Sequence, residues 1–244
     1  MVVMENGDPV NRRDHFARVP AGRASDELGD QRLAFRRWYH YAVCIVVTAV
    51  VAIDVPRPSK AAGVDALIAK RYEEFSLPTP TPTSVIVCHG FGCRFRTPIA
   101  LSAADDAKLA QFFSSGHASA EAERKAVAQA VAWFQRRVAT EAGTASAKAY
   151  ATGVFDAKPS QFDCIDASTN TTTTLLVLSE LGLLKYHRLV APVSRSPLLG
   201  LGVIHTTAVL VELQDGREWA IDSWVRNNGE PPDVLPLKIW YAGN

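Results

Sequence analysis

The pattern of apolar and polar positions between residues 84 and 225 predicts both helices and strands. Ser102 and Ser119 stand at helix N-cap positions, and Gly182 stands at the left-handed position that commonly ends a helix. Helical spacing is found in three stretches, at residues 102–113, 119–139 and 164–181. Shorter runs rich in β-branched residues predict strands at residues 85–88, 93–96, 187–193, 203–213 and 217–224.

The third helical stretch contains the run Asn170–Thr174, which is compatible with a strand as well. Thr and Asn are poor helix formers, so the composition of this run alone favours a strand. Leucines follow at Leu175, Leu178 and Leu181, three residues apart, and this spacing favours a helix. We therefore predict a helix that begins near Cys164 and ends before Gly182.

The dipeptide Asp215-Gly216 separates the last two predicted strands and is typical of a tight β-hairpin. A two-residue loop at this point pairs Asp222 with Val209 across the hairpin. Val209 and His205 are four residues apart, so His205 and Asp222 face the same side of the sheet. In this register they lie about 13 Å apart along the strands, at about 3.3 Å per residue. Direct contact between them requires a bulge or a longer loop.

The N-terminal region differs from the rest of the chain in composition. Residues 1–37 are polar with little periodicity, and we expect a disordered leader there. Arg36-Arg37 precede a run of 13 almost entirely apolar residues at 41–53. Basic residues before such a run are typical of a secretory signal, so residues 38–55 are predicted to be a signal peptide or a membrane anchor. A buried strand is the alternative interpretation.

This interpretation makes the protein periplasmic or secreted, or attached to the inner membrane through an uncleaved segment. Residues 56–83 are rich in Pro and Thr, as in an extended linker, with a short helix at about residues 64–75. The folded domain is then expected to span residues 84–244. The first 55 or so residues are expected to be dispensable for folding.

The composition limits the classes of partner. The 244 residues are 48% hydrophobic and 21% charged, which is enough apolar material for a core. The formal net charge is only +1, so nothing favours nucleic acid or an acidic membrane surface as a partner. The sequence has no Gly-rich phosphate loop, zinc-ligand spacing or internal repeat.

The cysteines predict one disulfide and one free thiol. Cys44 lies in the predicted signal and is lost if that segment is cleaved. Cys88 and Cys93 flank a four-residue turn, where a disulfide can join the two strands of a hairpin. Cys164 is then the odd cysteine, which in an exported protein indicates a reactive thiol. The alternative is that Cys88 and Cys93 are two separate reduced thiols. A metal site needs more ligands than these two cysteines and His89 provide.

Three residues suggest nucleophilic catalysis. Cys164 lies at the N-terminus of its predicted helix, where the helix dipole favours thiolate over thiol. His205 begins an apolar strand and can act as the base, and Asp222 ends the next strand and can orient the imidazole. The backbone N–H of Cys164 and the side chain of Gln161 are the candidate oxyanion donors. The alternatives are an inert buried cysteine, a core histidine and a strand-end aspartate.

The segments around these residues resemble a known family. Asp163-Cys164-Ile165-Asp166 before a helix, His205-Thr206-Thr207-Ala208-Val209-Leu210 on a strand and Trp219-Ala220-Ile221-Asp222 on the next are similar to the bacterial transglutaminase-like cysteine proteinases. The resemblance covers about residues 155–225. It implies a papain-like α+β fold, with the cysteine helix packed on an antiparallel sheet and additional helices N-terminal to it. It also implies that the cysteine, histidine and aspartate meet in one site.

The chain departs from the family pattern near the cysteine. Ala167-Ser168 stand where an aromatic residue is usual, and Ile165 stands where an acidic residue is frequent. Some family members bind calcium beside the cysteine, and the missing acid weakens that expectation here. We expect no cofactor, although Asp163 and Asp166 remain candidates to support a calcium ion.

The sequence therefore predicts an exported thiol hydrolase that cleaves a peptide or amide bond through an acyl-enzyme. A protein or peptide is the expected substrate, and no residue pattern specifies which. Two alternatives remain open: acyl transfer to an amine by the same three residues, and a catalytically idle domain that uses the same fold to bind a partner.

Overall fold

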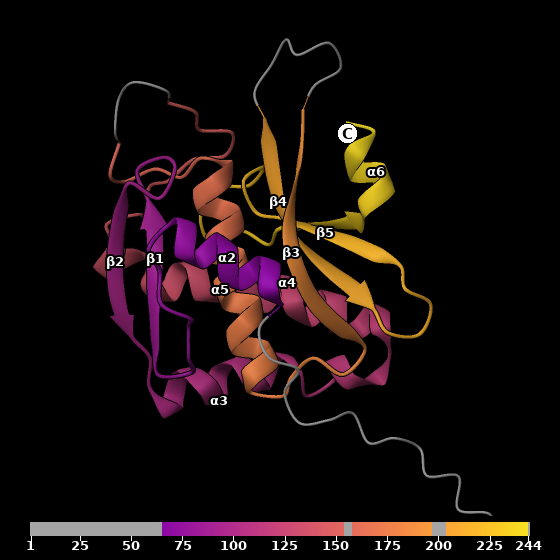
Figure 1. Cartoon of the computed structure of the whole chain (residues 1–244). Coiled ribbons are helices and arrows are strands. Elements are labelled where there is room, and N and C mark those ends of the chain that lie inside the picture. Colours follow the sequence, from indigo (N-terminus) through magenta and orange to yellow (C-terminus); the bar gives the residue numbers. More distant parts are fainter. Residues whose placement is uncertain (1–64, 154–157, 197–203, 244) are drawn as a thin grey trace, which may run out of the picture. The chain divides into compact units, whose positions relative to one another are not determined.

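The computed structural model describes residues 65–153, 158–196 and 204–243 (Figure 1). The predicted leader, the predicted signal or anchor and the first part of the predicted linker lie outside these residues. Within the part of the chain that is described, no helix combines the length and apolar character needed to cross a membrane.

The described residues form an α+β fold with two antiparallel sheets. Strands β1 (Ser84–His89) and β2 (Phe95–Ala100) make the smaller sheet. The larger sheet has the order β3-β4-β5-β6, with bounds His187–Arg195, His205–Glu212, Glu218–Asp222 and Asp233–Pro236. The helices are α2 (Ala66–Glu74), α3 (Ala103–Phe112), a 3-10 turn (Gly116–Ala118), α4 (Ala120–Ala142), α5 (Cys164–Glu180) and α6 (Leu237–Tyr241).

Helix ends follow the caps predicted from the sequence. The hydroxyl of Ser102 accepts the N–H of Asp105, and the Asp105 carboxylate accepts the N–H of Ser102, so α3 begins with a complete capping box. Ser119 caps α4, as predicted. Gly182 follows α5 with φ of 68°, a conformation that glycine adopts without steric cost.

Helix α5 lies between the two sheets and contacts both β1 and the larger sheet (Figure 1). Its residues Thr171–Thr174 are helical and buried, which confirms the helix prediction. The hydroxyls of Thr172 and Thr174 donate to carbonyls one turn earlier. Thr171 hydrogen bonds Ser223, and Thr173 hydrogen bonds a residue of α2. The run is compatible with a buried helix because each hydroxyl has a partner.

Helix α2 corrects the predicted domain boundary. Ile68 and Tyr72 are buried, and the Tyr72 hydroxyl lies 2.6 Å from the Thr173 hydroxyl of α5. Leu77 joins the same apolar cluster. The helix itself was predicted at about residues 64–75, but it was placed inside a linker, and the predicted start of the folded domain at Ser84 is too late. The chain from residue 65 onward already belongs to the folded unit, because α2 buries an apolar face on it.

Candidate active site

The hairpin between β4 and β5 brings His205 and Asp222 together. The backbones of Glu212 and Arg217 hydrogen bond across the hairpin, so the loop between them has four residues, not the two that Asp215-Gly216 suggested. The register therefore shifts by two residues, and Asp222 comes opposite Thr207 instead of Val209. The Nε2 atom of His205 lies 2.5 Å from Oδ2 of Asp222. The longer loop is what the predicted contact required.

Cys164 is the first residue of α5 and lies beside the start of β4. Its Sγ donates to the carbonyl oxygen of Ile204 at 3.3 Å, one residue before His205. Cys164, His205 and Asp222 are all buried, with 3–5% of each residue exposed. In the part of the chain that is described, the Nδ1 atom of His205 has no hydrogen-bond partner. The structure thus gathers the three predicted residues at one end of α5 and leaves one imidazole nitrogen free.

The electrostatics of the thiol differ from the sequence expectation. Burial raises the pKa of Cys164 above the usual cysteine value, and the charge of Asp163 adds to this. Hydrogen bonds from Thr206 act in the opposite direction but are outweighed. Burial therefore opposes the effect that was expected from the helix N-terminus and favours the thiol over the thiolate.

Two tryptophans enclose the imidazole of His205. The ring of Trp224 lies 4.7 Å from that of His205, and the ring of Trp240 lies 5.2 Å away (centroid distances). Strand β6, helix α6 and Trp240 were not predicted, although the apolar positions Leu235, Leu237 and Trp240 near the C-terminus indicated a packed segment.

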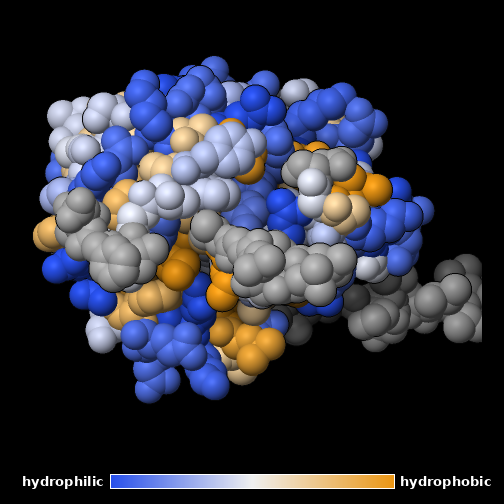
Figure 2. Space-filling view, turned by 90° about the horizontal axis from the view of Figure 1, so that it is seen from above, coloured by the Kyte–Doolittle hydropathy of each residue, from blue (hydrophilic) through white to orange (hydrophobic). Residues whose placement is uncertain are grey.

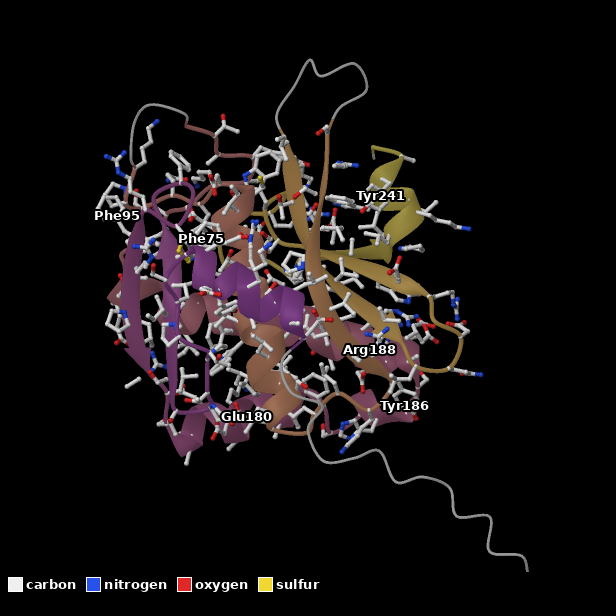
Figure 3. The ribbon with its side chains drawn as sticks, viewed as in Figure 1. Phe75, Phe95, Glu180, Tyr186, Arg188 and Tyr241 are labelled. Atoms are coloured by element: carbon white, nitrogen blue, oxygen red, sulfur yellow. A yellow bond between two sulfur atoms is a disulfide. The ribbon has the colours of Figure 1, made fainter. Side chains whose placement is uncertain are left out.

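The predicted disulfide between Cys88 and Cys93 is present, and the loop that it closes contacts the N-terminus of α5 (yellow bond in Figure 3). The side-chain amide of Asn170 on α5 bonds both the N–H and the carbonyl of Cys88, at 2.8 and 2.7 Å. The N–H groups of Phe91 and Cys93 donate to the carboxylate of Asp166, at 2.7 and 2.6 Å. The disulfide loop thereby fixes the turn of helix that carries Cys164.

The acidic pair beside Cys164 does not offer a calcium site. Asp163 accepts N–H groups on both carboxylate oxygens, from Ile165 and Asp166 on one and from Gly92 on the other. Both oxygens of Asp166 likewise accept backbone N–H groups. A cation needs free oxygen ligands, and these four are surrounded by donors. The described residues contain no cluster of three or more His, Cys, Asp or Glu side chains that could hold a metal ion.

The tentative oxyanion role of Gln161 finds no support. Its side-chain oxygen accepts the N–H of Lys148 at 2.9 Å, and its side-chain nitrogen donates to the carbonyl of Ser146 at 3.4 Å. The amide therefore braces the loop before the cysteine helix. The backbone N–H of Cys164 remains the candidate donor, because the first N–H groups of a helix have no partner within the helix.

Asp166 makes a pH-dependent contribution to stability. Burial, followed by the charge of Asp163, raises the pKa of Asp166 to about 7, against about 3.9 in an unfolded chain. The folded protein then binds an extra proton between these values, so this contribution is full below about pH 4 and is lost as pH rises through about 7. We expect the free energy of unfolding to fall more steeply from pH 5 to 8 in wild type than in Asp166→Asn.

Urea unfolding at several pH values measures this difference. Asp215→Asn serves as the control, because Asp215 lies in the exposed β4–β5 loop and its pKa is lowered by hydrogen bonds and charge from Arg217. Its slope over the same range should match that of wild type. Equal slopes for wild type and Asp166→Asn would show that Asp166 titrates normally.

No protein-family model, curated protein or solved structure matches this chain. The resemblance to the transglutaminase-like cysteine proteinases therefore rests on the residues of this chain alone.

Proposed function

We propose that this protein is a papain-like thiol hydrolase that cleaves a peptide or amide bond through a Cys164 acyl-enzyme. The observation that carries the proposal is the hydrogen bonding of the two ring nitrogens of His205. One ring nitrogen is bound to Asp222, and the other has no partner among the described residues. The Cys164 thiol contacts the carbonyl of Ile204, the residue before His205. This is the arrangement that a general base needs to accept a proton from a nucleophile.

The proposed reaction begins when substrate displaces the contact of the thiol with the Ile204 carbonyl. The Cys164 sulfur attacks the carbonyl carbon, and its proton passes to Nδ1 of His205. Asp222 stabilises the imidazolium that forms, and the Cys164 N–H donates to the oxyanion. The imidazolium then protonates the leaving amine. Water, deprotonated by His205, hydrolyses the thioester, which releases a carboxylic acid and restores the thiol.

One further observation supports an exported protein. A disulfide persists in an oxidising compartment, and Cys88 and Cys93 form one. The face seen from above presents hydrophobic as well as hydrophilic residues (Figure 2), as ordinary protein surfaces do, and does not specify the substrate. Attachment through residues 38–55 remains a prediction from sequence.

A binding domain without catalysis is the second candidate, and one contact favours it. The Cys164 thiol donates to a backbone carbonyl, and burial raises its pKa, so both features oppose formation of the thiolate. In this alternative the domain binds a partner, and His205 has no role in activating Cys164.

Alkylation of the native protein separates the two candidates. We expect iodoacetamide to modify Cys164 in wild type at pH 7 and the rate to fall about tenfold or more in His205→Ala, because the base is lost. Peptide mapping of the Cys164 peptide gives the rate and excludes signal from Cys44. Equal rates in both proteins, or labelling only after unfolding, would exclude the activated thiol and favour the binding domain.

A further inference from the structure

The carboxylate of Asp222 accepts two hydrogen bonds on one oxygen. Nε2 of His205 lies 2.5 Å from Oδ2, and the indole N–H of Trp240 donates to the same atom at 2.8 Å. Within the described residues the other oxygen, Oδ1, is buried without a partner. The carboxylate of Asp222 is therefore oriented entirely through Oδ2, and Trp240 supplies one of its two anchors.

Trp240 is placed by elements that sequence reasoning did not include in the site. It belongs to the five-residue helix α6, which directly follows β6, and Asp233 of β6 pairs with Asp222 of β5. The side chain of Arg195 on β3 lies over the Trp240 ring, 4.5 Å from its centroid, and donates to the Trp240 carbonyl. Figure 3 shows the neighbouring Tyr241 on α6, beside the larger sheet. Both β3 and β6 thus fix the position of the indole.

The indole is suited to orient a charged partner without neutralising it. Trp240 is 2% exposed, so its N–H has no access to bulk water as an alternative acceptor. An indole is a neutral donor, so its hydrogen bond orients the Asp222 carboxylate without placing a positive charge beside it. The same ring packs against the His205 ring at 5.2 Å, so one side chain limits the motion of both partners.

We propose that Trp240 is a positioning residue that holds Asp222 in the rotamer required to orient His205. This rests on the proposed function of the Cys164 site. Without the indole N–H, the Asp222 carboxylate is free to turn its unpartnered oxygen toward another donor, and the imidazole loses its alignment with the thiol. The C-terminal helix then contributes to the site through Trp240, which acts through Asp222 and His205.

Trp240→Phe tests this because it keeps a ring against His205 and removes the N–H. We expect alkylation of Cys164 at pH 7 to slow by about tenfold, the effect of losing one hydrogen bond to a charged group. Trp219→Phe is the matched control. It removes an indole N–H that donates to another carboxylate, that of Glu212 at 3.2 Å, from the same strand as Asp222. Its alkylation profile across pH should equal that of wild type.

Two comparisons separate positioning from general packing. Trp224→Phe also keeps a ring on His205, but its lost N–H donates to Ala151 and not to Asp222, so its effect should be smaller than that of Trp240→Phe. In an Asp222→Asn background, Trp240→Phe should add little, because it acts through Asp222. If Trp240→Phe does not fold, Arg195→Met is the second variant. It removes the guanidinium that lies over the Trp240 ring, so it should also slow the alkylation of Cys164.

The outcomes distinguish this inference from the proposed function. If Cys164 is alkylated at the wild-type rate in Trp240→Phe but slowly in His205→Ala, the role of Trp240 is overturned and the proposed function stands. Full additivity of Trp240→Phe with Asp222→Asn overturns it as well, since the residue then acts by another route. Equal rates in wild type and His205→Ala overturn the proposed function itself.

Discussion

A Cys164→Ser variant is expected to lose turnover by a factor of about 10³ or more while keeping its fold. The hydroxyl is a much weaker acid than the thiol, so the imidazole of His205 cannot generate an oxygen nucleophile at a useful rate. Incubation of the purified full chain with a periplasmic protein extract, followed by mass spectrometry of new N-termini, compares the variant with wild type. Wild-type cleavage that persists unchanged in the variant would assign activity to another group.

The fold should survive this change because little depends on the sulfur. The hydrogen bond of Cys164 goes to the Ile204 carbonyl, and a serine hydroxyl can donate to the same atom. His205→Ala should be comparably severe for turnover, and Asp222→Asn comparable or milder. The three effects should not add, because the residues act as one unit. Thermal unfolding of each variant checks that lost activity does not come from lost structure.

Local signals in the sequence predicted the helices well. Ser102 and Ser119 cap α3 and α4, and Gly182 ends α5, because capping depends on a few adjacent residues and on backbone conformation. The disulfide was predictable for a similar reason, since Cys88 and Cys93 are close in sequence. These features need no knowledge of the rest of the fold.

The hairpin register was not predictable from its turn dipeptide. Asp215-Gly216 indicates a turn, but the residues that pair across it depend on what the flanking side chains contact. Glu212 pairs with Arg217, and its buried carboxylate accepts from Arg124 of α4 and from Trp219. The contact with Arg124 comes from a helix 88 residues earlier, so the resulting four-residue loop depends on tertiary packing.

The same limit applies to the reactivity of the cysteine. The position of Cys164 at a helix N-terminus is a local fact and was predicted correctly. Its burial comes from β4, which lies far along the chain, and burial outweighs the helix terminus in setting the direction of the pKa change. Trp240 was missed for a related reason, because its contact with Asp222 depends on the pairing of β6 with β5.

Glu123→Ala is expected to be strongly destabilising although Glu123 lies away from the site. From sequence, Glu123 is one of two acids in the first turn of α4, where it favours the helix dipole. In the structure it is fully buried and accepts the backbone N–H groups of Lys185, Tyr186 and His187, at 2.6–3.1 Å. It also accepts from Nδ1 of His187 at 2.8 Å. It thereby fixes the start of β3, at the end of the molecule where Tyr186 and Arg188 are labelled in Figure 3.

The tautomer of His187 follows from its contact with Arg124. Arg124 lies 3.2 Å from Nε2 of His187, and a guanidinium can only donate, so Nε2 accepts and Nδ1 carries the proton toward Glu123. Alanine at position 123 leaves that donor and three backbone donors buried without an acceptor. Loss of one partner from such a buried arrangement costs about 3–5 kcal/mol, which corresponds to a fall of about 10 °C in the thermal midpoint.

Glu121→Ala is the matched control for this prediction. Glu121 lies in the same first turn of α4, so both substitutions remove the same favourable interaction with the helix dipole. Its carboxylate is exposed and pairs with the exposed Lys125, so we expect little change in the thermal midpoint. Comparable losses in the two variants would mean that Glu123 acts only through the dipole. A large fall in the thermal midpoint of Glu123→Ala, a smaller fall in Glu123→Gln and little change in Glu121→Ala would show that the N–H groups at the start of β3 need this acceptor.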